Sequence, residues 1–240
     1  MIDCHSHILY GIDDGCKTIE DSIETIKNLK GIGFDTIILT PHYLKGSEYV
    51  ANNKEKKERY NILCDRVKEE NIDVKLYLGN EIYITDDIEE LIFNKEVTTL
   101  NLSRYVLIEL PLYNEINNVE DYIYELKLKG YKPIIAHPER YSYYQENVHK
   151  LISLYKSGVL FQSNYGSLIG NYGKHAMKLI KYMLKNNMIT FMGTDIHRKD
   201  SSMLSDFDYI KRTIKKYVGE ENFNKITHDN ILKVINDECI

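Results

Sequence analysis

Short apolar runs alternate with longer amphipathic segments along the whole chain. The runs are four or five residues long and rich in Ile, Val, Leu or Tyr, which is typical of strands buried on both faces of a sheet. We predict strands at Met1–Cys4, Thr36–Thr40, Val74–Leu78, Tyr105–Ile108, Pro133–Ala136, Val159–Gln162 and Ile189–Met192.

Between these runs, apolar residues recur at spacings of three and four, the period of a helix that packs one face on a core. Thr18 can cap the first helix with Asp21 as the acid of a capping box, and Gly31 or Gly33 can end it. Further helices are predicted at about Glu48–Glu70, Asn118–Lys129, Val148–Lys156, Lys174–Lys185, Leu204–Tyr217 and Asn230–Asn236.

The alternation of strands and helices indicates an α/β fold with a parallel sheet. Seven such units predict a barrel of the TIM type, although a doubly wound open sheet is an alternative that periodicity does not exclude. The 240 residues contain no internal repeat, low-complexity segment or linker. We therefore expect residues 1–240 to form a single domain.

Composition and charge exclude several classes of protein. The chain has 31 basic and 36 acidic side chains, and its net charge of −5 argues against a nucleic-acid groove. Its four cysteines are far apart, with no CxxC pair, which favours reduced thiols in a cytoplasmic protein. The first residues, MIDCHSHILYG, do not read as a signal peptide, and no apolar run is long enough to span a membrane.

Polar residues gather where the predicted strands end, and the carboxyl ends of parallel strands open on one face of the sheet. The segments concerned are Asp3-Cys4-His5-Ser6-His7, Thr40-Pro41-His42, Gly79-Asn80-Glu81, Ile108-Glu109, Ala136-His137, Ser163-Asn164 and Gly193-Thr194-Asp195-Ile196-His197. A single strand-end His or Glu is more often a satisfied polar group than a ligand. So many imidazoles and carboxylates in one crevice need compensation, which divalent cations supply. A nitrogen and oxygen set without thiolate suits Mn, Fe or Zn.

The ordered motifs Asp3-x-His5-x-His7, His42, Glu81, His137 and Asp195-x-His197 resemble those of the PHP (polymerase and histidinol phosphatase) superfamily. More narrowly, the chain is similar to bacterial capsule-type, manganese-dependent tyrosine-protein phosphatases in the segments MIDCHSHILYGIDDG, TIILTPHYLKG, YVLIELP and KPIIAHPERY. The resemblance implies a distorted TIM-like (β/α)₇ barrel, the PHP fold. It also implies up to three divalent ions, Mn²⁺ first, with Fe or Zn as alternatives.

Carried onto this chain, the resemblance implies three overlapping ligand groups. These are His5, His7, Glu81 and Asp195 for one ion; Glu81, Glu109 and His137 for a second; and Asp14, His42 and His197 for the third. Sequence spacing alone would not choose Asp14 over its neighbour Asp13. His42 and metal-bound water are the candidates for the general acid.

Arginines complete the expected site. Arg140, three residues after His137, is expected to bind phosphate oxygens through its planar guanidinium. Family members often have arginines where this chain has Tyr43 and Ser202, and Arg198 is a candidate to replace the second of these in holding phosphate.

The reaction that the resemblance implies is hydrolysis of phosphotyrosine by metal-activated hydroxide. The implied substrate is an autophosphorylated bacterial tyrosine kinase that controls capsule or exopolysaccharide synthesis. Two alternatives remain open: a phosphoesterase for a small monoester such as histidinol phosphate, and a catalytically weak metal-binding regulatory protein. Thiol chemistry is excluded, because no cysteine begins the CxxxxxR signature of cysteine-based phosphatases.

Overall fold

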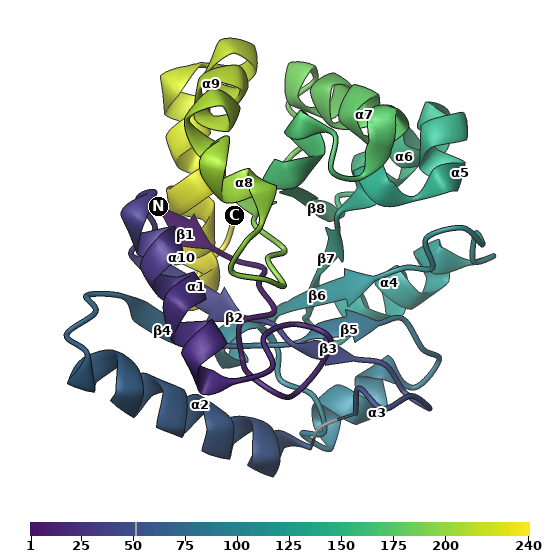
Figure 1. Ribbon diagram of the computed structural model, residues 1–240. Coiled ribbons are helices and arrows are strands. Elements are labelled where there is room, and N and C mark those ends of the chain that lie inside the picture. Colours follow the sequence, from purple (N-terminus) through teal and green to yellow (C-terminus); the bar gives the residue numbers. More distant parts are fainter. Residues whose placement is uncertain (51) are drawn as a thin grey trace.

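A parallel sheet forms the centre of the molecule. The computed structural model describes residues 1–50 and 52–240, and the sheet curls with helices on its outside (Figure 1). Its strands are β1 Ile2–Asp3, β2 Thr36–Leu39, β3 His42–Tyr43, β4 Lys75–Leu78, β5 Glu81–Tyr83, β6 Tyr105–Glu109, β7 Lys132–Ala136, β8 Leu160–Asn164 and β9 Phe191–Gly193. All seven predicted strands are present, and β3 and β5 are additional short strands.

The two additional strands continue β2 and β4 beyond a break in each. The breaks fall at Thr40-Pro41 and at Gly79-Asn80. Pro41 has no N–H to give to a ladder, and a Cβ on Gly79 would lie 2.8 Å from a methyl of Leu100. The sheet bends at these points, so the strands pair in two sets, β1-β2-β4 and β3-β5-β6-β7-β8-β9.

Pairing follows chain order from one end of the sheet to the other, which excludes the doubly wound alternative, since that topology reverses at a switch point. The segments that follow β1 and β9 then meet. The N–H of His7 donates to the carbonyl of Ile196 at 3.0 Å, and the N–H of Asp195 donates to that of His5 at 2.8 Å. The TIM-like prediction is confirmed.

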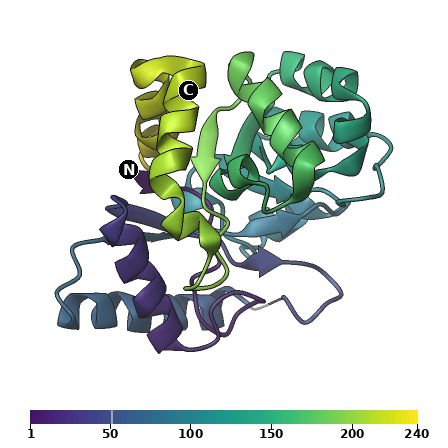
Figure 2. The same cartoon turned by 45° about the horizontal axis from the view of Figure 1, so that its top comes forward.

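Helices cover the outer face of the sheet (Figure 2). They are α1 Ile19–Gly31, α2 Asn53–Glu69, α3 Ile88–Phe93, α4 Val119–Leu128, α5 Ser142–Glu146, α6 Val148–Lys156, α7 Gly173–Lys185, α8 Ser202–Ser205, α9 Phe207–Asn224 and α10 Asn230–Ile235. Short 3₁₀ turns lie at η1 Leu100–Leu102, η2 Pro138–Arg140 and η3 Tyr165–Ile169, and a π-helical turn lies at η4 Lys225–Asp229.

Caps explain where two helices begin. Thr18 caps α1 as predicted, its Oγ accepting from the N–H of Asp21 at 3.2 Å. The helix predicted from Glu48 begins later, at Asn53, because Asn52 caps α2 by accepting from the N–H of Glu55 at 3.0 Å. Residue 51 of that prediction lies outside the described residues. The helix predicted to start at Leu204 is divided into α8 and α9.

The inside of the curled sheet changes character along the strands. Near the amino ends it is apolar: Tyr105 and Leu107 of β6 pack with Ile134 of β7, and α10 adds Ile231 and Val234. Near the carboxyl ends of the strands, polar residues line the inside of the sheet. The apolar base thus supports a polar carboxyl edge. Among the described residues, no helix combines the length and apolarity needed to cross a bilayer.

Candidate metal centre

The expected ligands meet at the carboxyl edge of the sheet. His5 and His7 follow β1, and Asp195 and His197 follow β9, so the bonds that join the ends of the sheet also bring these four side chains together. Glu81 begins β5 beside His42 of β3, to which it is paired in register. The backbone topology alone therefore gathers residues that are up to 192 positions apart in the chain (His5 to His197).

Three buried atoms form the tightest group, Nε2 of His5 and His7 and Oε2 of Glu81, and Oδ1 of Asp195 lies beside the two imidazoles. The two Nε2 atoms are 3.1 Å apart, and each lies 3.2 Å from the Glu81 oxygen. Asp195 Oδ1 lies 3.5 Å from His5 and 3.3 Å from His7. Ligand atoms bound to one ion at about 2.0–2.2 Å lie roughly 3.0–3.5 Å from each other. The spacing of the His5, His7 and Glu81 atoms matches that of ligands around a single divalent ion.

Glu81 also belongs to a second group. Its Oε1 lies 2.9 Å from Nε2 of His137, which is 3.8 Å from Oε1 of Glu109. On the other side, His42 Nδ1 lies 2.9 Å from Glu81 Oε2 and 3.7 Å from Glu109 Oε2. Glu81 therefore stands between the groups, as a bridging carboxylate would, and His42 lies closer to it than expected.

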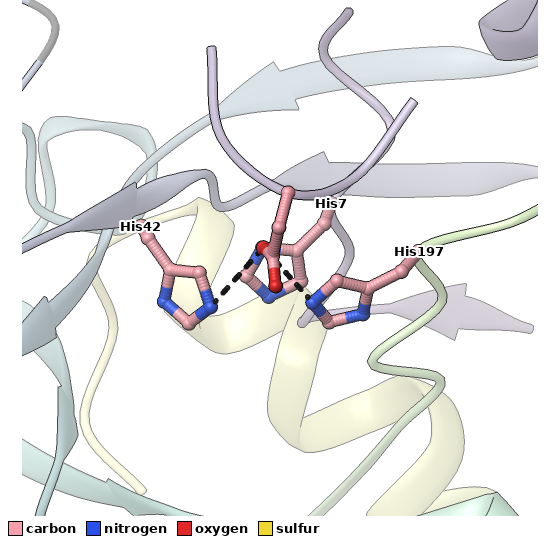
Figure 3. A group of neighbouring side chains, drawn as sticks. His7, His42 and His197 are labelled. Carbon is pink, nitrogen blue, oxygen red and sulfur yellow. Dashed lines mark ion pairs between the residues drawn. The ribbon is translucent and has the colours of Figure 1, made fainter. Parts of the chain in front are cut away.

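The third group surrounds Asp14, where His7, His42 and His197 converge on one carboxylate (Figure 3). Asp14 Oδ1 lies 3.6 Å from Nε2 of His42 and 3.4 Å from Nε2 of His197. The rings of His7 and His197 stack with their centroids 4.0 Å apart. This group lies nearer the surface, since the Asp14 side chain is 48% exposed.

The neighbouring Asp13 has a different place. Its side chain is buried, and Oδ2 accepts from His7 Nδ1 at 2.7 Å and from the N–H of His42 at 2.9 Å. Asp13 orients two imidazoles, while Asp14 faces the third group. The sequence could not separate the two residues because both belong to one turn.

Hydrogen bonds also turn the other histidines toward the centre. His5 Nδ1 bonds to Oε1 of Gln162 at 2.8 Å, and His197 Nδ1 bonds to the backbone carbonyl of Asp195 at 2.9 Å. Such bonds fix the tautomer and leave Nε2 free for a metal. Gln162 was missed at the sequence level because it lies within a predicted strand, and no spacing signal marks it.

The electrostatics of the group favour a cation at its centre. Glu81 Oε2 is buried and accepts no hydrogen bond from the described residues, although imidazole nitrogens of His5, His7 and His42 lie within 3.2 Å. Burial opposes charge on His5, yet Glu81 and Asp195 outweigh it and raise the pKa of His5 to about 9. A metal ion supplies the same positive charge and takes neutral imidazole as its ligand. The residues present therefore fit a divalent metal.

His137 and Asp195 adopt backbone conformations that are unusual for residues with a Cβ. Their φ values are 34° and 51°, both in the left-handed region. Such strain persists only where surrounding structure imposes it, and it concentrates at functional sites. Gly193 is needed nearby, since a Cβ there would lie 2.7 Å from Nε2 of Gln162 and 2.9 Å from Cβ of His5.

Arg140 reaches the centre through Asp195. Its Nη1 donates to Asp195 Oδ2 at 2.7 Å, and its guanidinium lies 4.4 Å from the centroid of the Tyr172 ring. Arg198 is exposed and lines a hollow of about 310 Å³ together with Asp14 and His197.

The two positions where arginines are often found in the family face other partners. The Tyr43 hydroxyl lies 3.4 Å from Glu96, and Ser202 Oγ donates to Oδ1 of Asn171 at 3.1 Å. Arg140 and Arg198 are therefore the arginines that lie beside the predicted ligands.

Comparison with known proteins decides the family. The family model described as capsular polysaccharide synthesis, CpsB/CapC, matches residues 1–236. The chain belongs to the CpsB/CapC family. The resemblance to capsule-type tyrosine-protein phosphatases is thereby confirmed.

Curated members of the CpsB/CapC family are similar over most of their length. The chain is 39% identical to the putative tyrosine-protein phosphatase CapC of Staphylococcus aureus, over 82% of this chain and 77% of the relative. It is 32% identical to the tyrosine-protein phosphatase CpsB of Streptococcus pneumoniae over the whole of both chains.

A solved structure shows the same fold. It comes from work on YwqE of Bacillus subtilis and CpsB of S. pneumoniae, described as metal-dependent tyrosine phosphatases, and superposes with a TM-score of 0.89 at 31% identity. The match covers 100% of this chain and 96% of the other.

Proposed function

We propose that this chain is a metal-dependent tyrosine-protein phosphatase of capsular polysaccharide synthesis. One observation carries the proposal: Glu81 lies within 2.9–3.2 Å of four imidazole nitrogens in a group that also contains Asp195. This arrangement suits metal-assisted hydrolysis of a phosphate ester. Family membership and relatives named as tyrosine-protein phosphatases support phosphotyrosine as the ester.

We assign the metal ligands by group. His5, His7, Glu81 and Asp195 would hold one ion, Glu81, Glu109 and His137 a second, and Asp14, His42 and His197 a third. Mn²⁺ is the ion we expect, because the ligands are imidazoles and carboxylates without a thiolate, and Fe or Zn are the alternatives. When bound, such ions activate water as a nucleophile and neutralise charge on the phosphoryl group.

The chain's own residues then bind and orient the substrate. Arg140 presents a fork of N–H donors to phosphate oxygens, and the Tyr172 ring holds its guanidinium in place. Arg198 stands at the rim, beside His197. The leaving phenol has an ordinary pKa of about 10, so it needs modest proton donation. His42, whose side chain is partly exposed at the opening of the centre, would supply it only in place of its role as a ligand of the third ion.

Cysteine chemistry makes no contribution in this proposal. Cys4 is fully buried, and burial raises the pKa of its thiol well above the ordinary range, which disfavours the nucleophilic thiolate. The cysteines of the described chain are free thiols. Reduced thiols support a cytoplasmic location, where the phosphotyrosine protein would be an autophosphorylated bacterial tyrosine kinase.

Turnover of matched substrates tests the proposal. Protein stripped with a chelator and reloaded with Mn²⁺ would be given a phosphotyrosyl peptide, the phosphoseryl peptide of the same sequence, and histidinol phosphate. We expect metal-dependent phosphate release, with the phosphotyrosyl peptide preferred over histidinol phosphate by at least about tenfold in kcat/KM. A large preference for histidinol phosphate would support the small-monoester alternative. If metal binds but no substrate is hydrolysed, a metal-binding regulatory protein is supported instead.

A further inference from the structure

The outward face of α7 carries only positive charge. Lys174, Lys178, Lys181 and Lys185 follow each other at spacings of four, three and four, which places them on one side of the helix. The opposite side is buried through Ala176, Ile180 and Met183. α7 contains no acidic residue. We call these four residues the α7 lysine face.

The lysines of the α7 lysine face are not held in ion pairs within the described part of the chain. None of its four lysines forms an ion pair with any residue that the structure describes, whereas many lysines elsewhere are paired. Lysines four residues apart repel each other, and Lys174 lies near the positive end of the helix dipole. The chain as a whole is acidic, with a net charge of −5. The arrangement is unfavourable for the isolated molecule and favourable for binding an anion.

The position of α7 connects this face to the metal centre. Tyr172, which directly precedes the helix, stacks on Arg140, and its hydroxyl lies 3.3 Å from Asp195 Oδ2. Lys174 follows two residues later. α7 packs against α5 and η2 (Figures 1 and 2). The lysines therefore lead away from the predicted phosphate-binding arginine along the outer surface.

A groove beside the α7 lysine face offers apolar contacts as well. It has a volume of about 340 Å³ and lies between α7 and the α5–α6 segment. Val148, Leu179 and Tyr182 contribute apolar surface, Lys174 and Lys178 stand at its side, and Glu146 is the one acidic residue in its lining. A groove with these properties fits a peptide better than it fits a flat membrane surface.

We infer that the α7 lysine face docks an acidic segment of the phosphoprotein substrate next to its phosphotyrosine, an inference that rests on the proposed function. Lys174 and Lys185 are separated by about 16 Å along the helix. An extended peptide covers that distance in about five residues. Asp and Glu residues spread over about five positions of an extended substrate segment can therefore contact all four lysines.

Two phosphotyrosyl peptides test the inference. One has Asp and Glu on both sides of the phosphotyrosine, and the other has Asn and Gln at the same positions. At low ionic strength, we expect the Mn²⁺-loaded protein to hydrolyse the acidic peptide with a KM roughly tenfold lower than its KM for the Asn/Gln peptide. This difference in KM should disappear at about 0.5–1 M salt, because salt screens the lysine charges.

Substitution isolates the surface. A variant with all four lysines of the α7 lysine face changed to Gln should lose the preference through KM, with kcat and hydrolysis of p-nitrophenyl phosphate unchanged. The matched control changes four unpaired lysines on other surfaces, Lys132, Lys156, Lys216 and Lys225. The inference is overturned if the α7 variant keeps the preference or if the control loses it equally.

Two further readouts separate the remaining outcomes. If neither peptide is hydrolysed, the proposed function fails, but the fluorescence anisotropy of the labelled acidic peptide still reports docking. Peptide binding that is lost in the α7 variant and kept in the control variant supports the inference. Peptide binding that is equal in the two variants, or absent from the wild-type protein, overturns it. Phosphatidylserine vesicles test a membrane partner. Vesicle binding that depends on the α7 lysine face, without any peptide preference, would assign the surface to lipid and overturn the inference.

Discussion

Asp13 Oδ2 accepts a hydrogen bond from His7 Nδ1 at 2.7 Å, which leaves His7 Nε2 facing Glu81 and Asp195. The same carboxylate accepts from the N–H groups of His42 and Gly15, both at 2.9 Å. Burial opposes its charge, but His7 holds the pKa of Asp13 far below its ordinary range. Asp13 is therefore a positioning residue for His7, and it acts from outside the ligand groups.

The first prediction follows from that role. The carboxylate of Asp13 accepts from three N–H donors, and the Asn side chain in Asp13→Asn would turn its own NH₂ group toward at least one of them. We expect His7 to lose its fixed orientation as a result. We expect Mn²⁺ affinity to fall roughly 10- to 100-fold while the fold is retained. Isothermal titration with Mn²⁺ and far-UV circular dichroism check this. Asp73→Asn, at a fully exposed side chain, is the control, and wild-type affinity in Asp13→Asn would contradict the positioning role.

Gly193 provides a second prediction, because it allows close packing behind His5. In Gly193→Ala the new methyl group would displace Gln162 or His5. We expect weaker Mn²⁺ binding and a destabilisation of about 1–3 kcal/mol in urea unfolding. Gly31→Ala meets no atom within 4 Å at the end of α1 and should leave both quantities nearly unchanged. Equal effects from the two substitutions would show that close packing of Gly193 against Gln162 and His5 is not what the metal centre depends on.

Arg140 provides a third prediction. Arg140→Lys keeps the positive charge near Asp195 and removes the planar fork of donors. The loss of a charge-assisted bidentate contact is expected to cost about 1.5–3 kcal/mol, or roughly 10- to 150-fold in kcat/KM for a phosphotyrosyl peptide. Steady-state kinetics measure the loss, and metal analysis should show an unchanged Mn²⁺ content. Unaltered kcat/KM would remove Arg140 from phosphate binding.

A fourth prediction concerns the buried Lys56, which donates to Asn80. Burial lowers the pKa of Lys56 from 10.5 to about 7. Between these values the unfolded chain binds the proton and the folded chain does not, so stability rises with pH across this window. Lys56→Met should reduce the slope of the unfolding free energy against pH by up to about 1.4 kcal/mol per pH unit between pH 7 and 10. Urea unfolding at several pH values checks this, and identical slopes would show that the ammonium is not desolvated.

The sequence predicted much of the fold, because the strands are apolar runs and most of the expected ligands lie at or just beyond the carboxyl ends of these runs. The convergence of His5, Glu81 and Asp195 then follows from parallel topology. Other features depend on contacts distant in the chain. The bends that create β3 and β5 arise where Pro41 and Gly79 interrupt a strand, and periodicity does not reveal them.

The residues that orient the ligands were the hardest to predict. Gln162 lies within a predicted strand without any signal of its own, and only the folded chain places its amide against His5. Asp13 and Asp14 are chemically identical neighbours, and only their burial and their partners in the folded chain distinguish them.

The central claim is that Glu81 joins two of the metal groups and that phosphotyrosine hydrolysis depends on it. The most direct test is the Mn²⁺ content per chain, measured by elemental analysis, in wild-type protein and in Glu81→Gln, together with phosphate release from a phosphotyrosyl peptide. We predict that Glu81→Gln keeps its circular dichroism spectrum, loses at least one bound Mn²⁺ and loses nearly all hydrolysis. A variant that retained the full metal content and activity would contradict the account.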